Sequence, residues 1–268
     1  MGRLEDKVAI ITGAARGMGE GAARVMAREG AIVVLTDILD EVHKTVENIR
    51  DNGYKAVSFK MDVTKLNEVN HVVQKVLEQF GKVDILVNNA GVSKLVPFVD
   101  MADEVRDKTF DVNLKGVFIV TKAVLPSMIE RKYGRIVNIS SVTGPLVADI
   151  GECAYAATKG AVWGFTRALA LEVVKDGITV NAICPGMIET PMVKQSAAEI
   201  NPKDPEGVLK RLASGIPMGR LGTIEELGEL VAFLASDESR YITGTPIIID
   251  GGSTIPESPG SFTSDSWT

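Results

Sequence analysis

The chain has 268 residues, of which 45% are hydrophobic and 24% charged, and its formal net charge is −6. This composition is typical of a folded globular protein, and the acidic charge argues against a nucleic-acid partner. Two cysteines and two histidines supply neither a disulfide framework nor a histidine-based zinc site, so we expect no metal. The N-terminus carries charges where a signal peptide is apolar, and we see no apolar run that is long enough to span a bilayer. We therefore expect a cytoplasmic protein with no membrane partner.

Short apolar runs alternate with amphipathic stretches along the chain. The runs predicted to be buried strands are Val8–Ile11, Ile32–Leu35, Ala56–Phe59, Ile85–Val87, Ile136–Ile139, Thr179–Ile183 and Pro246–Ile249. Between them, apolar residues recur at spacings of three and four, as in Gly17–Glu29 and Leu66–Phe80, and predict helices. This alternation predicts an α/β fold with a doubly wound parallel sheet and helices on both faces.

The domain organisation is expected to be simple, because no linker or repeat interrupts the alternation. We predict one domain over residues 1–252, with a substrate lid at 187–222, where prolines and polar residues indicate a long loop with short helices. Residues 253–268 lose all periodicity and are predicted to be a C-terminal tail.

A glycine-rich turn follows the first predicted strand, in the segment Thr12-Gly-Ala-Ala-Arg-Gly-Met-Gly. Glycines allow a tight turn and a close approach to a pyrophosphate, and the following helix offers free N–H groups to phosphates. We assign Gly13, Arg16, Gly17, Met18 and Gly19 to cofactor binding, although such glycines also occur in plain turns.

Asp37 ends the second predicted strand and is the main guide to cofactor choice. A carboxylate at this point can bind the adenosine ribose hydroxyls and would repel a 2′-phosphate, so NAD is favoured over NADP. The alternative is that Asp37 caps a helix. Arg16 favours NADP instead, since its guanidinium can reach a 2′-phosphate.

Two further strand ends fit the same ligand, because ligands of such sheets bind outside the carboxyl ends of the strands. Asp62 and Val63 follow the third predicted strand and would contact adenine. Asn89, Ala90 and Gly91 follow the fourth. Each segment alone is no more than a turn, but several consecutive strand ends are consistent with one crevice.

A tyrosine and a lysine open a later helix, at Tyr155 and Lys159. They are four residues apart and share one helix face. We expect the ammonium to lower the pKa of the phenol, so that the tyrosine can exchange a proton with an alcohol or a carbonyl oxygen. Ser140 and Ser141 end a strand upstream, where a hydroxyl can polarise the same oxygen. Asn113 is expected at the start of another long helix.

These motifs together resemble the short-chain dehydrogenase/reductase family of the Tyr-x-x-x-Lys type, over residues 4–252. The matching segments are TGAARGMG, NNAG, Asn113, Ser141, YAATK and Pro185-Gly186. The resemblance implies a Rossmann-type sheet of seven strands and a catalytic tetrad of Asn113, Ser141, Tyr155 and Lys159. It also implies that Lys159 binds the nicotinamide ribose and that Asn113 holds a water molecule of a proton relay. Pro185, Gly186, Ile188 and Thr190 would frame the nicotinamide.

The resemblance further implies a homotetramer that assembles through two long helices, at about residues 104–131 and 153–175. The expected activity is reversible hydride transfer between NAD(H) and a secondary alcohol or ketone, whose oxygen would contact Ser141 and Tyr155. Two alternatives are a 3-oxoacyl-[acyl-carrier-protein] reductase-like activity, for which Lys132 offers one cation, and a non-catalytic nucleotide-binding sensor. Candidate pocket residues are Ser93, Leu146, Val147, Asp149, Glu152, Met187 and Met192, although for the two acids we favour the alternative of loop charges that face solvent.

Overall fold

Seven parallel strands form one continuous sheet in this computed structural model, which describes residues 2–256. The strands are β1 Val8–Thr12, β2 Ile32–Asp37, β3 Ala56–Lys60, β4 Ile85–Asn88, β5 Gly134–Ile139, β6 Ile178–Pro185 and β7 Pro246–Ile249. Their order across the sheet is β3-β2-β1-β4-β5-β6-β7. All seven predicted strands are confirmed, and every observed strand boundary lies within two residues of the predicted boundary.

The strands of the sheet centre are buried on both faces, which explains why they read as unbroken apolar runs. The α-helices are α1 Gly17–Arg28, α2 Glu41–Asp51, α3 Leu66–Phe80, α4 Asp103–Phe110, α5 Gly116–Arg131, α6 Cys153–Val173, α7 Pro191–Ile200, α8 Pro205–Ser214 and α9 Ile224–Ala235. The predicted helix at Leu66–Phe80 coincides with α3, and the one at Gly17–Glu29 ends one residue earlier as α1.

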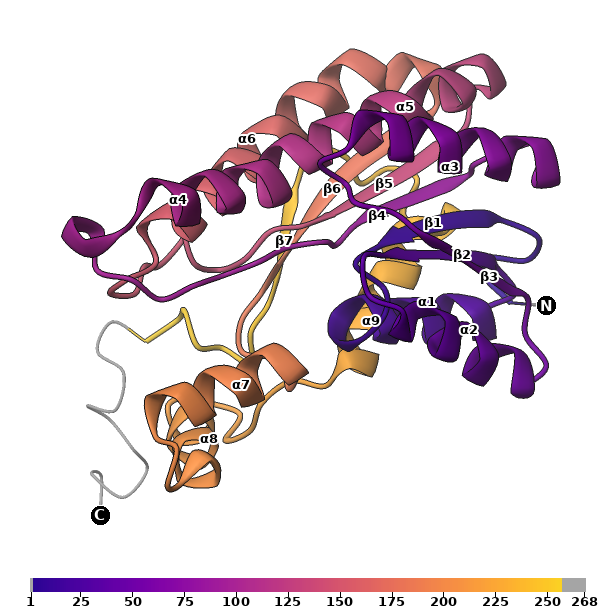
Figure 1. Cartoon of the computed structure of the whole chain (residues 1–268). Coiled ribbons are helices and arrows are strands. Elements are labelled where there is room, and N and C mark those ends of the chain that lie inside the picture. The colour runs from indigo at the N-terminus through magenta and orange to yellow at the C-terminus, as the bar shows by residue number, and fades with distance from the viewer. Residues whose placement is uncertain (1, 257–268) are drawn as a thin grey trace.

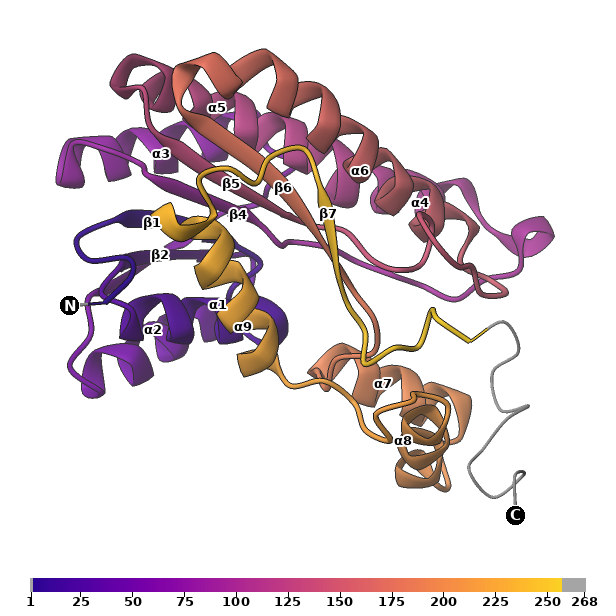
Figure 2. The ribbon, with the colours of Figure 1, turned by 180° about the vertical axis from the view of Figure 1, so that it is seen from behind.

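Helices cover both faces of the sheet, as Figure 1 and the reverse view in Figure 2 show. One apolar core joins α1, α2 and α9 to one face, through residues such as Met26, Val46 and Leu227. A second core joins α3, α5 and α6 to the other face, through residues such as Val73 and Val124. The predicted doubly wound arrangement is therefore confirmed.

The strand order reverses at β1, which pairs with β2 on one side and with β4 on the other. Such a switch point opens a crevice at the carboxyl ends of the strands, where ligands of doubly wound sheets bind. The topology thus brings the segments after β1, β2, β4, β5 and β6 to one edge of the sheet.

A continuous helical run covers residues 103–131, in which α4 and α5 are joined by a π-helical turn at Asp111–Lys115. Asn113 lies inside this run and not at its start, so the expected position of Asn113 was wrong. The run is long and apolar enough to cross a membrane by length and composition alone, with a mean hydropathy of 1.4 in its best window. Helices in the core of a protein pass the same test, and here the run packs against α3 and α6.

The predicted lid forms a small unit of two helices beyond the carboxyl edge of the sheet (Figure 1). Thr190 caps α7 by accepting a hydrogen bond from Val193 N at 3.3 Å. The two helices share their own apolar cluster, centred on Ala197, Val208 and Leu209. The lid region is therefore largely helical.

The chain turns sharply after β7, around the carboxylate of Asp250. This carboxylate accepts hydrogen bonds from Gly252 N at 2.9 Å and from Thr254 N at 2.9 Å. The first residues of the predicted tail are held in this turn, and residues 257–268 lie outside the described part of the chain.

Candidate active site

The glycine loop between β1 and α1 is shaped to bring its backbone close to a ligand. Gly13 and Gly17 both have φ +64°, a conformation that disfavours any other residue. A Cβ on Gly13 would lie 2.7 Å from Ala90 Cα, and a Cβ on Gly19 would lie 2.4 Å from Gly13 O. Arg16 precedes α1 without a side-chain cap, so the first N–H groups of the helix remain available to an anion. The loop therefore has the close backbone approach and free N–H groups that a pyrophosphate site needs, and the binding role of these residues stays a prediction.

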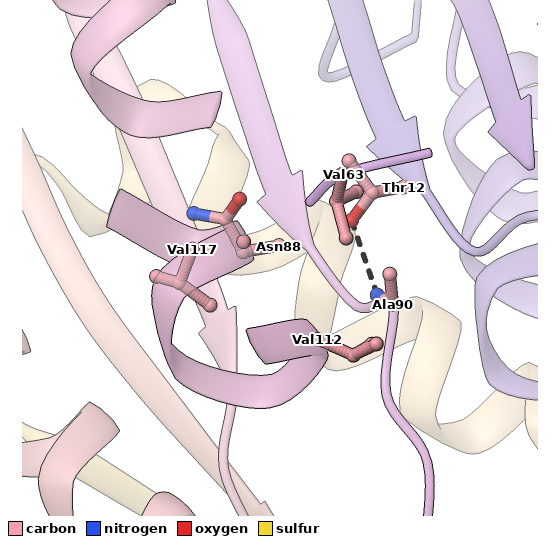
Figure 3. A pocket seen from close by; sticks show the side chains of 7 residues that line it. Thr12, Val63, Asn88, Ala90, Val112 and Val117 are labelled. Atoms are coloured by element: carbon pink, nitrogen blue, oxygen red, sulfur yellow. Dashed lines mark hydrogen bonds between the residues drawn. The ribbon is translucent and has the colours of Figure 1, made fainter. Parts of the chain in front are cut away.

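The loop after β4 is fixed to the end of β1 by Thr12, a residue that the sequence analysis did not assign to the site. Thr12 Oγ1 accepts hydrogen bonds from Asn89 N at 3.0 Å and from Ala90 N at 3.1 Å, the second of which is drawn in Figure 3. The Asn89 side chain donates to Gly13 O at 2.8 Å. These bonds bring together Gly13 and the predicted contacts Asn89, Ala90 and Gly91. Thr12 was missed although the motif TGAARGMG begins with it, because only the glycines, Arg16 and Met18 of that motif were assigned to the site.

Asp37 lies at the carboxyl end of β2 and holds the glycine loop in place. Its carboxylate accepts hydrogen bonds from Ala15 N and from Leu39 N, each at 3.0 Å. It does not cap α2, whose N-cap is Asp40. A carboxylate has about four acceptor positions, so both oxygens can still accept hydrogen bonds from ribose hydroxyls.

Asp62 and Val63 follow β3 but differ in exposure. Asp62 Oδ1 accepts hydrogen bonds from Thr64 N at 2.9 Å and from the Thr64 hydroxyl at 2.8 Å, while Oδ2 has no partner among the described residues. Val63 is buried against Gly116, where a Cβ would lie 2.7 Å from Val63 Cγ2. It lines a recess with Thr12 and Ala90 that has no room for a water molecule, so this side chain contributes packing (Figure 3).

Asn113 is buried at the π turn and links three segments. Its Oδ1 accepts a hydrogen bond from Val92 N at 2.8 Å, and its Nδ2 donates to Val92 O at 2.9 Å and to Thr158 Oγ1 at 3.3 Å. Both ends of the amide are thus occupied by protein groups. The side chain fixes the loop after β4 against the start of α6, which carries Tyr155 and Lys159.

Lys159 is 5% exposed, and its Nζ donates to Ile139 O at 2.7 Å. It has no carboxylate partner among residues 2–256, and burial lowers its pKa to about 8. The Ser140 hydroxyl donates to Lys159 O at 2.8 Å and so anchors the helix turn that carries the lysine. Ser140 is therefore engaged in structure, which leaves Ser141 as the serine available to a substrate.

Tyr155 lies beside Ser141, and Lys159 Nζ is 5.4 Å from the centre of the tyrosine ring. Burial raises the pKa of Tyr155 to about 12, a hydrogen bond with Ser141 opposes the rise, and the charge of Glu152 adds to it. Burial therefore outweighs the hydrogen bond from Ser141 in the protein alone. The expected lowering of this pKa by Lys159 does not appear among these effects and stays a prediction.

The end of β6 and the segment after it, which carry Pro185, Gly186, Ile188 and Thr190, run beside the glycine loop. Their expected role in framing the nicotinamide stays a prediction. Gly186 N donates to Ile249 O at 2.9 Å, and a Cβ on Gly186 would lie 2.7 Å from Asp250 Cβ. A Cβ on Gly17 would lie 3.6 Å from Thr190 Cβ, so this segment meets the first turn of α1. Met18 packs on the core below.

The candidate pocket residues divide by exposure. Leu146, Val147, Met187 and Met192 are all between 38% and 48% exposed, so these apolar side chains are accessible to a ligand. Asp149 is exposed, as the loop-charge interpretation predicts. Glu152 is half-buried next to Ser93 and Thr143, so its interpretation as a solvent-facing charge was wrong.

A chain of buried polar side chains behind the site was not predicted. Asn88 Nδ2 donates to Asn138 Oδ1 at 2.8 Å and to Thr121 Oγ1 at 3.0 Å, and Asn138 Nδ2 donates to Thr166 Oγ1 at 2.9 Å. It joins β4 and β5 to α5 and to α6, which carries Tyr155 and Lys159. An asparagine within an otherwise apolar strand is the signal that could have revealed it.

Comparison with known proteins agrees with this geometry. A family model described as enoyl-(acyl carrier protein) reductase matches residues 13–254, and the chain belongs to the short-chain dehydrogenase/reductase family. It is 54% identical to oxidoreductase UcpA of Salmonella typhimurium, over 96% of this chain and 98% of that protein. It is 43% identical to 3-oxoacyl-[acyl-carrier-protein] reductase FabG of Thermotoga maritima, over 94% of this chain and 100% of that protein. Among solved structures, levodione reductase superposes with a TM-score of 0.90 at 34% identity, covering 94% of this chain and 98% of that one.

Proposed function

We propose that this oxidoreductase catalyses reversible hydride transfer between NAD(H) and a secondary alcohol or ketone, with Tyr155 as the acid–base. The observation that carries the proposal is the convergence of Tyr155, Ser141 and Lys159 beside the glycine loop, at the carboxyl edge of the sheet. The nicotinamide, when bound, accepts or supplies the hydride. Tyr155, Ser141 and Lys159 then handle the substrate oxygen and its proton.

In ketone reduction, Tyr155 donates its proton to the carbonyl oxygen while Ser141 holds that oxygen by a hydrogen bond. A phenol with a pKa of about 12 is fully protonated near neutral pH, which is the form that an acid needs. In alcohol oxidation, Tyr155 must first lose this proton. Lys159 would then favour the phenolate through its positive charge, to which an oxidised nicotinamide, when bound, would add. Asn113 would order the path by which protons reach Lys159.

NAD is proposed over NADP because of the position of Asp37. Its carboxylate is fixed by Ala15 N and Leu39 N at the end of β2, where a 2′-phosphate would meet a negative charge. Arg16 is exposed and has no ion-pair partner among residues 2–256, so it remains the competing element in favour of NADP.

The second candidate is reduction of a ketone carried by acyl carrier protein, which the FabG relative and the family description favour. Such a role requires cations for an acidic partner. Lys132 is paired with Asp176 at the exposed surface, so the one cation expected for this role has an acidic neighbour. A non-catalytic sensor is disfavoured because all four residues of the expected tetrad are present.

A homotetramer is proposed on the basis of the outer surface of α5 and α6. Phe118 is 50% and Leu171 80% exposed there, and the positions of Gly160 and Gly164 are open to a close neighbour. Large exposed apolar side chains on adjacent helices are typical of a subunit interface.

Replacement of Tyr155 by Phe tests the proposal directly, because it keeps the ring and removes the transferable proton. Turnover of alcohols and ketones should fall about 100-fold or more, while NADH affinity, measured by fluorescence titration, should be retained. Tyr54→Phe, at an exposed position remote from the site, is the matched control. Full activity in a folded Tyr155→Phe protein would refute the mechanism.

A further inference from the structure

Glu152 occupies an unusual position immediately before α6, three residues ahead of Tyr155. It is the N-cap residue of α6, yet its side chain does not cap the helix. Instead the carboxyl group lies half-buried among the side chains of Ser93 and Thr143. An acidic side chain is thus turned away from the helix end, where it would be most stabilised, and toward polar groups of two other loops.

The loops that surround Glu152 are held together and are continuous with the proposed catalytic residues. Val96 N donates to Gly151 O at 3.0 Å, which ties the loop after β4 to the loop before α6. Thr143 N donates to Ser141 Oγ at 3.1 Å, so Thr143 and the catalytic serine share one turn. The charge of Glu152 is close enough to Tyr155 to raise the pKa of the phenol. Glu152, Ser93 and Thr143 therefore border the place where the substrate oxygen is held.

No cation pairs with Glu152 among residues 2–256. Burial raises its pKa, and the nearby charge of Asp149 raises it further. Hydrogen bonds from Ser93 and Thr143 oppose this rise. A carboxylate accepts hydrogen bonds, and the hydroxyl groups of Ser93 and Thr143 can both donate and accept them. This mixed set of donors and acceptors suits a neutral hydroxyl group of a ligand.

We propose that Glu152, with Ser93 and Thr143, forms a subsite that binds a second hydroxyl group of the substrate, next to the carbon oxidised or reduced at Tyr155. This inference rests on the proposed function and narrows its substrate class to vicinal diols and α-hydroxy ketones. The exposed apolar side chains of Leu146, Val147 and Met192 would cover the carbon skeleton. A site built to bind a hydroxyl group discriminates against an analogue that lacks it, because its buried polar groups then stay unpaired.

The test compares cyclopentanol with cyclopentane-1,2-diol, which share a ring and differ by one hydroxyl group. Dissociation constants are measured by saturation-transfer NMR in the presence of saturating NADH, so that no alcohol is turned over. The wild-type protein should bind the diol about tenfold more tightly than cyclopentanol, the size of one good hydrogen bond. Glu152→Ala should reduce this ratio to near one, and Glu152→Gln, which still donates and accepts, should keep about a threefold preference.

Glu47→Gln, on the exposed surface of α2, makes the same acid-to-amide change away from the site and should leave the tenfold ratio unchanged. Equal binding of the two ligands by the wild-type protein would overturn the proposal, and so would a preference that survives in Glu152→Ala. Oxidation of both ligands is then assayed with NAD and with NADP. A preference in binding without any turnover would contradict the proposed function and leave the hydroxyl subsite standing.

Discussion

The buried ammonium of Lys159 should make the protein less stable at neutral pH than at alkaline pH. Burial lowers the pKa of Lys159 from 10.5 to about 8, and its only polar contact in the described structure is the carbonyl of Ile139. Since a difference of one in pKa corresponds to about 1.4 kcal/mol, the charged form costs the folded state about 3 kcal/mol. A residue selected for stability alone would not carry this charge here.

The sign of the pH dependence follows from proton binding. Between pH 8 and pH 10.5 the unfolded chain keeps the proton on Lys159 and the folded protein releases it. The free energy of unfolding therefore rises with pH across this window because of this group, and the gain is lost again as the pH falls to 8. Other groups titrate in the same range, so the contribution of Lys159 has to be isolated by comparison with a variant.

Lys159→Met keeps the length of the side chain and removes the charge. At pH 7 the variant should be more stable than the wild type, and this advantage should shrink by about 3 kcal/mol as the pH approaches 10.5. The assay is guanidinium unfolding at fixed protein concentration, at intervals of one pH unit, with Lys44→Met on the exposed face of α2 as the control. If the difference in unfolding free energy between Lys159→Met and the wild type does not change between pH 7 and pH 10, the reasoning is refuted.

Three further predictions concern the cofactor site and the assembly. Asp37→Ser should raise the ratio of kcat/KM with NADP to kcat/KM with NAD by about tenfold or more. In hydrogen exchange, the glycine loop should be less disordered in Asp37→Asn than in Asp37→Ser, because the amide oxygen of Asn can still accept one of the two backbone hydrogen bonds. Gly19→Ala places a Cβ 2.4 Å from Gly13 O and should cost about 1–3 kcal/mol in thermal unfolding and abolish measurable NADH binding, whereas Gly160→Ala, which has open space, should do neither. Light scattering should report a tetramer at micromolar concentration, and a monomer would exclude the proposed role of α5 and α6.

The sheet could be predicted from the sequence because its strands are buried on both faces. Runs such as Val8–Ile11 have no polar residue that would allow another interpretation, and the flanking glycines and acids mark their ends. The candidate site could also be located, since parallel strands end at the same edge. Asp37, Asp62 and Asn89 were therefore placed together without any knowledge of side-chain contacts, whereas Lys159 was added through the family resemblance.

The remaining features depend on contacts that no local pattern encodes. The π turn at Asn113 is a change in backbone hydrogen bonding within a continuous helix, and its residues still favour a helix. The pairing of Asn88 with Asn138 depends on the register of β4 and β5. The raised pKa of Tyr155 reflects burial by several loops, so the spacing between Tyr155 and Lys159 was a poor guide to it.

Buried charged groups are ion-paired at the amino edge of the sheet but lack an oppositely charged partner at its carboxyl edge in the described structure. At the amino edge, Asp84 is 1% exposed and contacts Lys82, Arg131 and Val8 N, and the buried Arg135 pairs with Asp237. These groups are compensated, as structural ions must be. At the carboxyl edge, Lys159 and Glu152 are buried or half-buried without a partner of opposite charge in the described structure, and burial shifts the pKa of each toward neutrality. Since an uncompensated ionisable group lowers stability, its presence at the edge where ligands bind argues that both groups act on a substrate or a cofactor.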